Sequence, residues 1–162
     1  MQKSKTLLII GFVWPEPKSS AAGCRMMQLI ELFQENGYTI TFATTAQNWE
    51  FSEDISAQKI STKIIELNSS SFDDFVKELN PTIVLFDRFM VEEQFGWRVS
   101  ESCPNALKLL DTEDLHCLRQ ARQLAVKENR EFTYEDLFSD VAKREIASIL
   151  RCDLSLMVSE FE

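Results

Sequence analysis

The sequence has no excess of basic residues. Its 162 residues include 17 Lys and Arg against 26 Asp and Glu, which gives a formal net charge of -9 and a pI near 4.7. A general binder of nucleic acids or of anionic membranes needs a basic face. The charge balance therefore argues against both classes and predicts no nucleic-acid partner, although a local basic patch would escape this count.

The sequence also lacks a membrane span, a secretion signal and a cysteine motif. No apolar run approaches the roughly 20 residues that cross a bilayer. Lys3 and Lys5 precede a short apolar run, but Pro15 and Pro17 interrupt the continuity that a signal peptide needs. These absences predict a cytoplasmic protein. The cysteines show no CxxC or zinc-like spacing, so we expect free thiols, mostly as small core residues, in a reducing compartment; they are Cys24, Cys103, Cys117 and Cys152.

Two common phosphate-binding motifs are absent as well. The dinucleotide fingerprint G-x-G-x-x-G cannot form, because a long proline-containing insertion separates Gly11 from Gly23. The P-loop pattern is also missing. We therefore expect no NAD or ATP site of the usual kind and no cofactor. An unrelated nucleotide-binding or flavodoxin-like enzyme remains a third hypothesis, which flavin or NAD binding would support.

Apolar segments alternate with segments of helical periodicity along almost the whole chain. Residues 6–11 form a short apolar run typical of a buried strand, Ser19 or Ser20 can cap the helix that follows, and Gly37 can end it. Residues 46–61 predict a loop with one short helical turn. Further strands are predicted at 38–45, 63–67, 82–86, 106–110 and 154–158, and further helices at 71–80, 90–100, 115–125 and 133–149.

Two of these helices carry more detailed predictions. Ser71 with Asp74, and Thr133 with Asp136, match the capping-box spacing at a helix start. The apolar stripe of the first helix would contain Phe72, Phe75, Val76 and Leu79, and that of the second Tyr134, Leu137, Val141, Ile146 and Ile149.

The strands are continuous apolar runs without polar alternation, which is typical of a parallel sheet covered on both faces. With right-handed crossovers, this predicts a doubly wound, Rossmann-like α/β fold with about six mostly parallel strands and helices on both faces. We see no internal repeat and no linker, so residues 1–162 are expected to form a single domain.

Polar residues follow several of the predicted strands. Ligands of such sheets bind outside the carboxyl ends of the strands, so we expect one binding mouth formed by residues 12–25, 87–88, 111–116 and 159–160. Each residue also has a structural alternative; Ser20, for example, would serve as a helix cap. The candidate substrate-binding residues are Pro15, Ser20, Gly23, Arg25, Asp87, Arg88, Asp111, Glu113, Ser159 and Glu160.

Asp111, Glu113 and Asp114 form the densest polar cluster, and His116 is the only histidine. Such carboxylates could accept hydrogen bonds from sugar hydroxyls, bind a cation, or act as a base if burial raised a pKa, and a solvated loop is an equal alternative. His116 could contact substrate or complete a helix cap. Glu113, Asp114 and His116 are therefore the catalytic candidates, and no Ser/His/Asp or Cys/His constellation can be argued.

The order and spacing of several motifs resemble a known family. The motifs are the apolar strand Leu7–Ile10, the loop Trp14–Pro17, the small residues Ser20–Gly23 with Arg25, and the segments Asn36–Thr41, Asn80–Val84 and Cys152–Glu160. Together they resemble the N-terminal half of a two-domain GT-B glycosyltransferase, and they are most similar to glycosyltransferase family 4. The resemblance covers essentially the whole chain.

The resemblance implies an enzyme that moves a sugar from a nucleotide-sugar donor to a hydroxyl of a glycan, a lipid or a small molecule, with retention of configuration and without bound metal. In that family a C-terminal domain holds most of the donor. Residues 1–162 lack it, so we expect them to form the acceptor-side domain and to be inactive alone.

Ser20–Arg25 would face the donor diphosphate. Glu113 stands where many relatives have a histidine, so the role of that histidine does not transfer directly. Contact with the cytoplasmic face of a membrane is a further expectation, because many relatives use lipid-linked acceptors.

A second class of function also fits the sequence. The chain could be a non-catalytic Rossmann-like module that binds a partner or a glycan. The sequence downstream of Glu162 would separate the two classes, because a second α/β domain with a basic pair and a glutamate motif favours the enzyme.

Overall fold

The computed structural model describes residues 5–47 and 52–162, and it contains a single six-stranded sheet. All five strand pairings are parallel, in the order β3-β2-β1-β4-β5-β6. The predicted doubly wound α/β fold is confirmed. The strands are β1 (Thr6–Gly11), β2 (Thr39–Thr44), β3 (Ser61–Ile64), β4 (Ile83–Asp87), β5 (Leu107–Asp111) and β6 (Leu154–Leu156).

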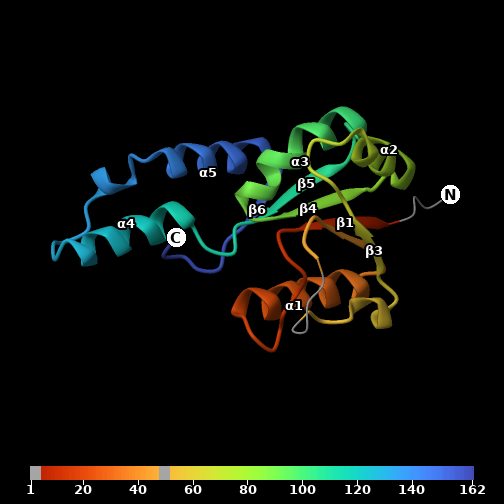
Figure 1. The fold of residues 1–162 in the computed structure, drawn as a ribbon, viewed down its shortest axis with the longest axis horizontal. Helices are drawn as coiled ribbons and strands as arrows, with labels where there is room; N and C mark the ends of the chain where they lie inside the picture. Colours follow the sequence, from red (N-terminus) through yellow and green to blue (C-terminus); the bar gives the residue numbers. More distant parts are fainter. Residues whose placement is uncertain (1–4, 48–51) are drawn as a thin grey trace.

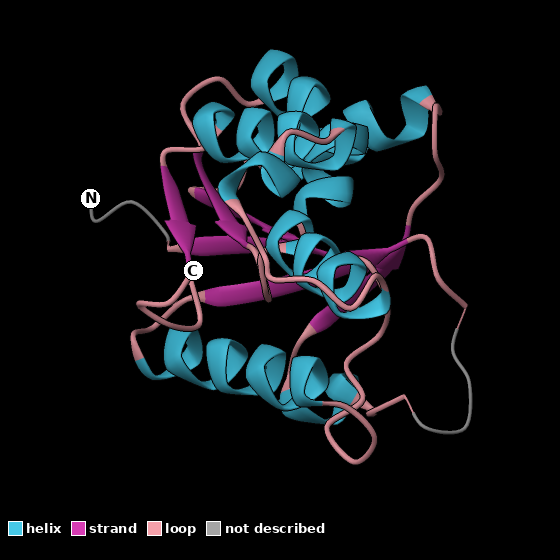
Figure 2. Cartoon of the chain, turned by 90° about the vertical axis from the view of Figure 1, so that its left-hand side faces the viewer, coloured by secondary structure: helices cyan, strands magenta, loops and turns pink. Residues whose placement is uncertain are grey.

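Helices cover both faces of the sheet (Figures 1 and 2). One face packs against α1 and the short 3-10 helix η1, and the other against α2, α3 and the end of α5. Helix α4 and the first part of α5 project beyond the carboxyl edge of the sheet. The bounds are α1 (Ala21–Glu35), η1 (Ile55–Gln58), α2 (Ser70–Leu79), α3 (Phe89–Ser102), α4 (His116–Lys127), η2 (Tyr134–Leu137) and α5 (Asp140–Arg151).

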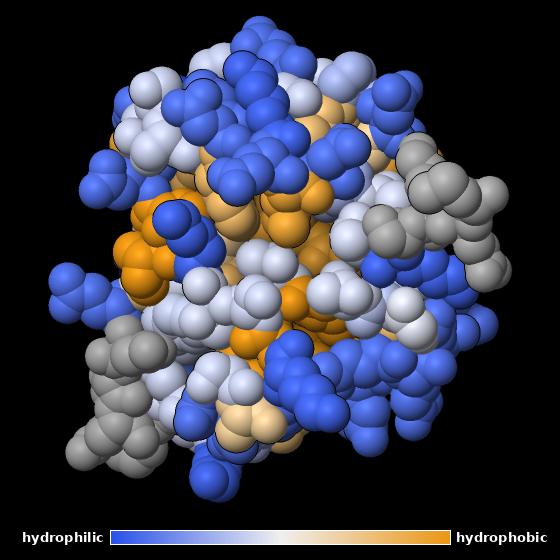
Figure 3. All heavy atoms as spheres, turned by 90° about the vertical axis from the view of Figure 1, so that its right-hand side faces the viewer, coloured by the Kyte–Doolittle hydropathy of each residue, from blue (hydrophilic) through white to orange (hydrophobic). Residues whose placement is uncertain are grey.

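The strands divide the core into two halves by alternation of their side chains. In β1, Leu8 and Ile10 face α2 and α3, whereas Leu7 and Ile9 face α1. All four are at most 1% exposed. On the face of the molecule drawn in Figure 3, apolar atoms form a band between two more polar regions of the surface. The same alternation places Asp87 and Asp111, which follow the apolar runs of β4 and β5, on the α1 side.

The residues at the two ends of α1 have the roles that the sequence predicts. The Ser20 hydroxyl accepts a hydrogen bond from the Gly23 amide at 3.0 Å, which caps the helix start, and Gly37 follows the helix end with a φ of +78°. Because the N-terminus of α1 lies at the carboxyl edge of β1, its free amides and positive dipole end face that edge.

Some boundaries differ from the predictions. Helix α2 is capped by Ser69, not Ser71, because the chain turns at Asn68 with a φ of +54° and the helix begins at Ser70. Strand β3 begins at Ser61 and ends at Ile64, earlier than the predicted 63–67. The predicted loop at 46–61 does contain one short helical turn, η1, although residues 48–51 lie outside the described residues.

The predicted helix at 133–149 is two elements. Thr133 and Asp136 form the predicted capping box, but it opens only the 3-10 helix η2. Helix α5 then begins anew, because the Ser139 hydroxyl accepts a hydrogen bond from the Ala142 amide. The predicted stripe is correct for Ile149, which packs against the core, but wrong for Tyr134 and Ile146, which are 83% and 51% exposed. The residues of α5 that are buried are Ala142, Glu145 and Ser148.

All four cysteines are free thiols, as predicted. Cys103 and Cys117 are buried and Cys152 is half-buried, but Cys24 is exposed, so the prediction of core residues is wrong for Cys24. Among the described residues, no helix combines the length and apolar character that crossing a bilayer requires.

Candidate functional site

The strand order reverses between β1 and β4, and a narrow cleft opens there. In doubly wound sheets ligands bind at this reversal, outside the carboxyl ends of the strands. The cleft volume is about 20 Å³, which is room for about one water molecule. The cleft brings together six of the ten predicted substrate-binding residues. Its lining consists of Val13, Trp14, Pro15, Ser20, Ala22, Gly23, Met26, Asp87, Arg88 and Glu113.

The loop after β1 forms one wall. Gly23 allows the loop to pass close to α1, because a Cβ atom at this position would lie 2.3 Å from the backbone carbon of Glu16. Trp14 is buried against Phe42, with ring centroids 5.5 Å apart, and its Nε1 donates to the Ala46 carbonyl at 2.9 Å. The loop is thus fixed by packing, and the wall that it forms is rigid.

Asp87 lies at the floor of the cleft, at the end of β4. The side chain is buried, and its Oδ2 accepts a hydrogen bond from the Phe12 amide at 2.9 Å. Its Oδ1 has no hydrogen-bond partner among the described residues, and the nearest cation is Arg88, whose Nε lies 3.5 Å away. Burial raises the pKa of Asp87, and the neighbouring Arg88 only partly opposes this shift.

Arg88 is held in an unusual backbone conformation. Its φ of +73° and ψ of +156° lie in a region that almost only glycine occupies, which costs about 1–3 kcal/mol. The Arg88 amide donates to the Asp111 carbonyl at 2.8 Å, so the pairing with β5 maintains this conformation. The guanidinium lies over the ring of Phe12, 5.1 Å from its centroid. The guanidinium therefore stays at the cleft, where it makes one long ion pair with the described residues.

Asp111 and Arg25 form a buried ion pair beside the cleft. The Asp111 side chain is completely buried, and Arg25 Nε donates to its Oδ1 at 2.9 Å while the Arg25 terminal nitrogen lies 2.8 Å from the same oxygen. The hydrogen bond to Asp111 raises the pKa of Arg25. Asp111 pairs in register with Asp87 on the neighbouring strand. Arg25 thus neutralises one of two adjacent carboxylates.

Glu113 completes the cleft from the loop after β5, where its φ is +63°. Burial raises its pKa to about 7, and the charges of Asp87 and Asp111 add to the shift while Arg88 and Arg25 oppose it. Glu113 is therefore the described carboxylate best placed to exchange a proton near neutral pH at this cleft.

We expect Glu113→Gln to reduce the loss of stability that accompanies a rise in pH from 4.5 to about 7. An acid whose pKa is raised on folding binds its proton more tightly in the folded state, so its contribution is fully favourable below the ordinary value of 4.5 and is lost as the pH rises to about 7. After a discount for partial exposure, the loss amounts to about 2 kcal/mol. Urea unfolding at pH 5 and pH 8 should show this difference for the wild type, and a smaller one for the variant. Exposed Glu101→Gln is the matched control; equal pH dependence in all three proteins would contradict the expectation.

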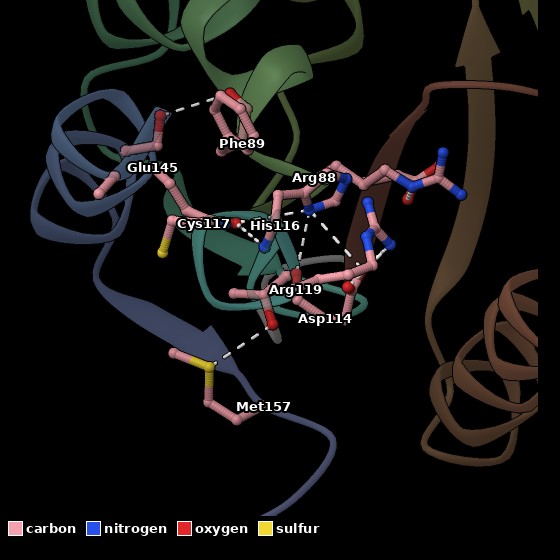
Figure 4. A network of polar contacts seen from close by, with 12 residues as sticks. Arg88, Phe89, Asp114, His116, Cys117, Arg119, Glu145 and Met157 are labelled. Carbon is pink, nitrogen blue, oxygen red and sulfur yellow. Dashed lines mark hydrogen bonds and ion pairs between the residues drawn. The ribbon is translucent and has the colours of Figure 1, made fainter. Parts of the chain in front are cut away.

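Asp114 and His116 are not among the residues that line the cleft, and they form structural contacts (Figure 4). Asp114 pairs with Arg119 at 2.8 Å. The amides of His116 and Cys117 donate to the two carboxylate oxygens of Glu145 at 2.9 and 2.8 Å, so a side chain of α5 caps α4. The hydrogen bond with Glu145 raises the pKa of His116. These contacts explain both residues as parts of the α4–α5 packing.

Glu145 is the residue that sequence reasoning missed. It is 1% exposed, and although burial opposes the charged form, hydrogen bonds from His116 and Cys117 lower its pKa. A signal existed, because Glu145 falls on the same helical face as Ala142 and Ser148. Phe12, which supports Arg88 and holds Asp87, lies in the predicted mouth at residues 12–25 but was not among the candidate substrate-binding residues.

The last two predicted site residues do not line the cleft. Ser159 and Glu160 are exposed, and the Ser159 hydroxyl accepts a hydrogen bond from the Phe161 amide at 3.2 Å. Among residues 5–47 and 52–162, no group of three or more His, Cys, Asp or Glu side chains has an arrangement that could hold a metal ion.

Comparison with known proteins identifies the fold. No family model and no curated protein match the sequence. The chain is similar to the structure of an α-glucosyltransferase in complex with UDP and a 13-mer DNA containing a HMU base, with a TM-score of 0.51 and 11% identity over 94% of this chain and 37% of that chain. It is also similar to an α-glucosyltransferase in complex with UDP-glucose and DNA containing an abasic site, with a TM-score of 0.50 and 14% identity over 94% and 36%. The chain thus spans little more than a third of these proteins, with which it shares a Rossmann-like, glycosyltransferase-like fold.

Proposed function

We propose that this chain is the acceptor-side half of a glycosyltransferase that uses a nucleotide-sugar donor, and that it is related to glycosyltransferase family 4. The observation that carries the proposal is the meeting of the α1 N-terminus with Asp87, Arg88 and Glu113 in one cleft at the reversal of strand order. The fold of the two UDP-bound α-glucosyltransferases supports the same reading.

The cleft offers suitable groups for a diphosphate. The amides of Ala21 and Ala22 begin α1 without an intrahelical acceptor, and the positive dipole end of the helix favours an anion there. Arg25, which the family resemblance assigns to this role, is engaged by Asp111. In our proposal Arg88 therefore supplies the guanidinium that faces the diphosphate, because the described residues use little of its hydrogen-bonding capacity.

Sugar transfer breaks the bond between the anomeric carbon and a diphosphate oxygen, so negative charge develops on the leaving group. Helix amides and Arg88 would stabilise this charge, and the rigid loop at Trp14 would position the sugar. We propose retention of configuration, no cofactor and no metal. A second domain would supply most of the donor contacts, so residues 1–162 alone are proposed to be inactive.

The acceptor in this proposal is a hydroxyl of a glycan, a lipid or a small molecule, in the cytoplasm or at the cytoplasmic face of a membrane. Both similar structures hold DNA, so the comparisons do not support the expectation from net charge that nucleic acid is no partner. A DNA duplex therefore belongs in the acceptor panel beside glycans and lipid-linked sugars.

Donor binding can be tested on the 162-residue chain by ¹H–¹⁵N NMR with UDP, UDP-glucose and a GDP-sugar. We expect amide shifts at residues 20–25 and 87–88, because these backbone groups would surround the diphosphate. Uridine, which has no phosphate, should leave them unchanged. Arg88→Gln should weaken UDP binding by about tenfold, as expected for a charged hydrogen bond, while exposed Arg122→Gln on α4 should not. Shifts confined to other parts of the chain would contradict the proposal.

One observation favours the alternative of a non-catalytic binding module. The cleft has room for only about one water molecule, and two of the three catalytic candidates are engaged in helix packing. If a longer chain with a second α/β domain binds nucleotide sugars but transfers none to any acceptor in the panel, the module is the better description.

A further inference from the structure

We propose that Asp87 Oδ1 recognises a single hydroxyl group of the sugar that enters the cleft. This inference rests on the proposed function, and it names the group that would select the sugar. The hydroxyl would donate a hydrogen bond to Oδ1, and no covalent step is involved.

The burial of Asp87 carries the inference. The residue is 4% exposed, and one oxygen of its carboxylate is satisfied by the Phe12 amide. The other oxygen is buried without a hydrogen bond from the described residues, in a side chain that belongs to the lining of the cleft. A buried carboxylate oxygen without a donor costs about 1–3 kcal/mol or more, so the site is completed when a donor arrives.

The size of the cleft limits what can fill it. A volume of about 20 Å³ admits one oxygen atom but no sugar ring. A ligand would therefore insert one hydroxyl group toward Asp87 and keep its ring outside, above the wall formed by Val13 and Glu113. In a cleft of this size, such a hydroxyl would take the place of a water molecule.

Charge excludes the other common occupants. The carboxylates of Asp87 and Glu113 line the cleft, and that of Asp111 lies beside it, so a phosphate oxygen would be repelled at the floor. Arg88 lies on one side of Asp87, with 3.5 Å between Nε and Oδ1. The arrangement suits a ligand that presents a hydroxyl to Asp87 and an anionic group to Arg88, as a sugar attached to a diphosphate does.

Asp87→Asn tests the assignment with little change in shape. The carboxamide oxygen can still accept from the Phe12 amide, so its NH₂ group faces the cleft and the acceptor becomes a donor. NMR titration of the 162-residue chain would compare UDP, UDP-glucose and its 2-, 3-, 4- and 6-deoxy analogues. A parallel series of methyl glucosides and their deoxy analogues distinguishes a donor sugar from an acceptor sugar.

For the wild type we expect one deoxy position, in one of the two series, to weaken binding by about tenfold or more, because a hydrogen bond to a charged group is lost. Asp87→Asn should bind the parent sugar as weakly as the wild type binds that analogue, and it should no longer distinguish the two. Exposed Asp74→Asn on α2 should behave as wild type.

Equal binding of all analogues by the wild type would overturn the inference, because Asp87 would then hold water only. The proposed function would survive that result if UDP still bound at residues 20–25. Absence of binding by UDP and by both sugar series would overturn the two together. If Asp87→Asn failed to fold, the analogue series with the wild type would still decide.

Discussion

Replacing Arg25 with alanine is expected to lower the free energy of unfolding by about 3–5 kcal/mol. Asp111 is completely buried, and Arg25 is its hydrogen-bonding cation, with Nε at 2.9 Å from Oδ1. Removing one partner of a buried ion pair leaves an uncompensated charge in a medium of low polarity. The Asp87 carboxylate on the neighbouring strand adds repulsion. Urea unfolding at pH 7 measures the loss.

The double variant Arg25→Ala with Asp111→Ala should recover part of this loss, because it removes the stranded charge together with its partner. Arg119→Ala is the matched control: this arginine also pairs with an aspartate at 2.8 Å, but its side chain is 47% exposed. We expect an effect below about 1 kcal/mol there. If Arg25→Ala lowers the free energy of unfolding no more than Arg119→Ala does, the buried ion pair with Asp111 does not stabilise the protein as we expect.

Replacing Glu145 with alanine is expected to destabilise the protein by about 3 kcal/mol and to loosen α4 from α5. The substitution leaves the amides of His116 and Cys117 without their acceptors at 2.9 and 2.8 Å, in a part of the helix start that has no cap of its own. Hydrogen exchange should accelerate through α4 more than through the sheet, because the loss is local to the projecting helices.

Glu145→Gln should fall between the wild type and the alanine variant, since one carbonyl oxygen remains to accept a hydrogen bond but the charge at the helix start is lost. Glu93→Ala provides the comparison, because Glu93 also bridges two helices, through Arg144 at 2.9 Å, at a more exposed position. The contribution of Glu145 should fade as the pH drops, because hydrogen bonds hold its pKa below the ordinary value. A stability loss for Glu145→Ala that is unchanged from pH 7 to pH 3 would contradict this origin.

The sheet could be predicted from the sequence because its two central strands, β1 and β4, are uninterrupted apolar runs. Leu7–Ile10 and Ile83–Phe86 have no polar residue that would leave their burial in question. The helix cap at Ser20 could also be predicted, because its hydroxyl accepts a hydrogen bond from the amide of Gly23, only three residues later. The meeting of Gly23, Asp87 and Glu113 also followed, because carboxyl ends of parallel strands share one edge.

Sequence reasoning did not reach contacts between residues that lie far apart in the chain. The catalytic candidate His116 contacts Glu145, which lies 29 positions later. Arg25 was a candidate substrate-binding residue, and the structure also places Asp111 of β5 against it. Ile146 fits a helical stripe, but α5 buries the face of Ala142, Glu145 and Ser148, so polar residues are inside and Ile146 is outside.

The pairing of Asp87 with Asp111 restricts how this chain can change in length. Both carboxylates reach the α1 side because each sits an even number of residues after a side chain that packs there, such as Leu85 and Leu109. Deleting one residue inside either strand would turn its acid to the opposite side, beneath α3. Relatives of this protein should therefore differ in length in the loops around these strands, and hardly ever within them.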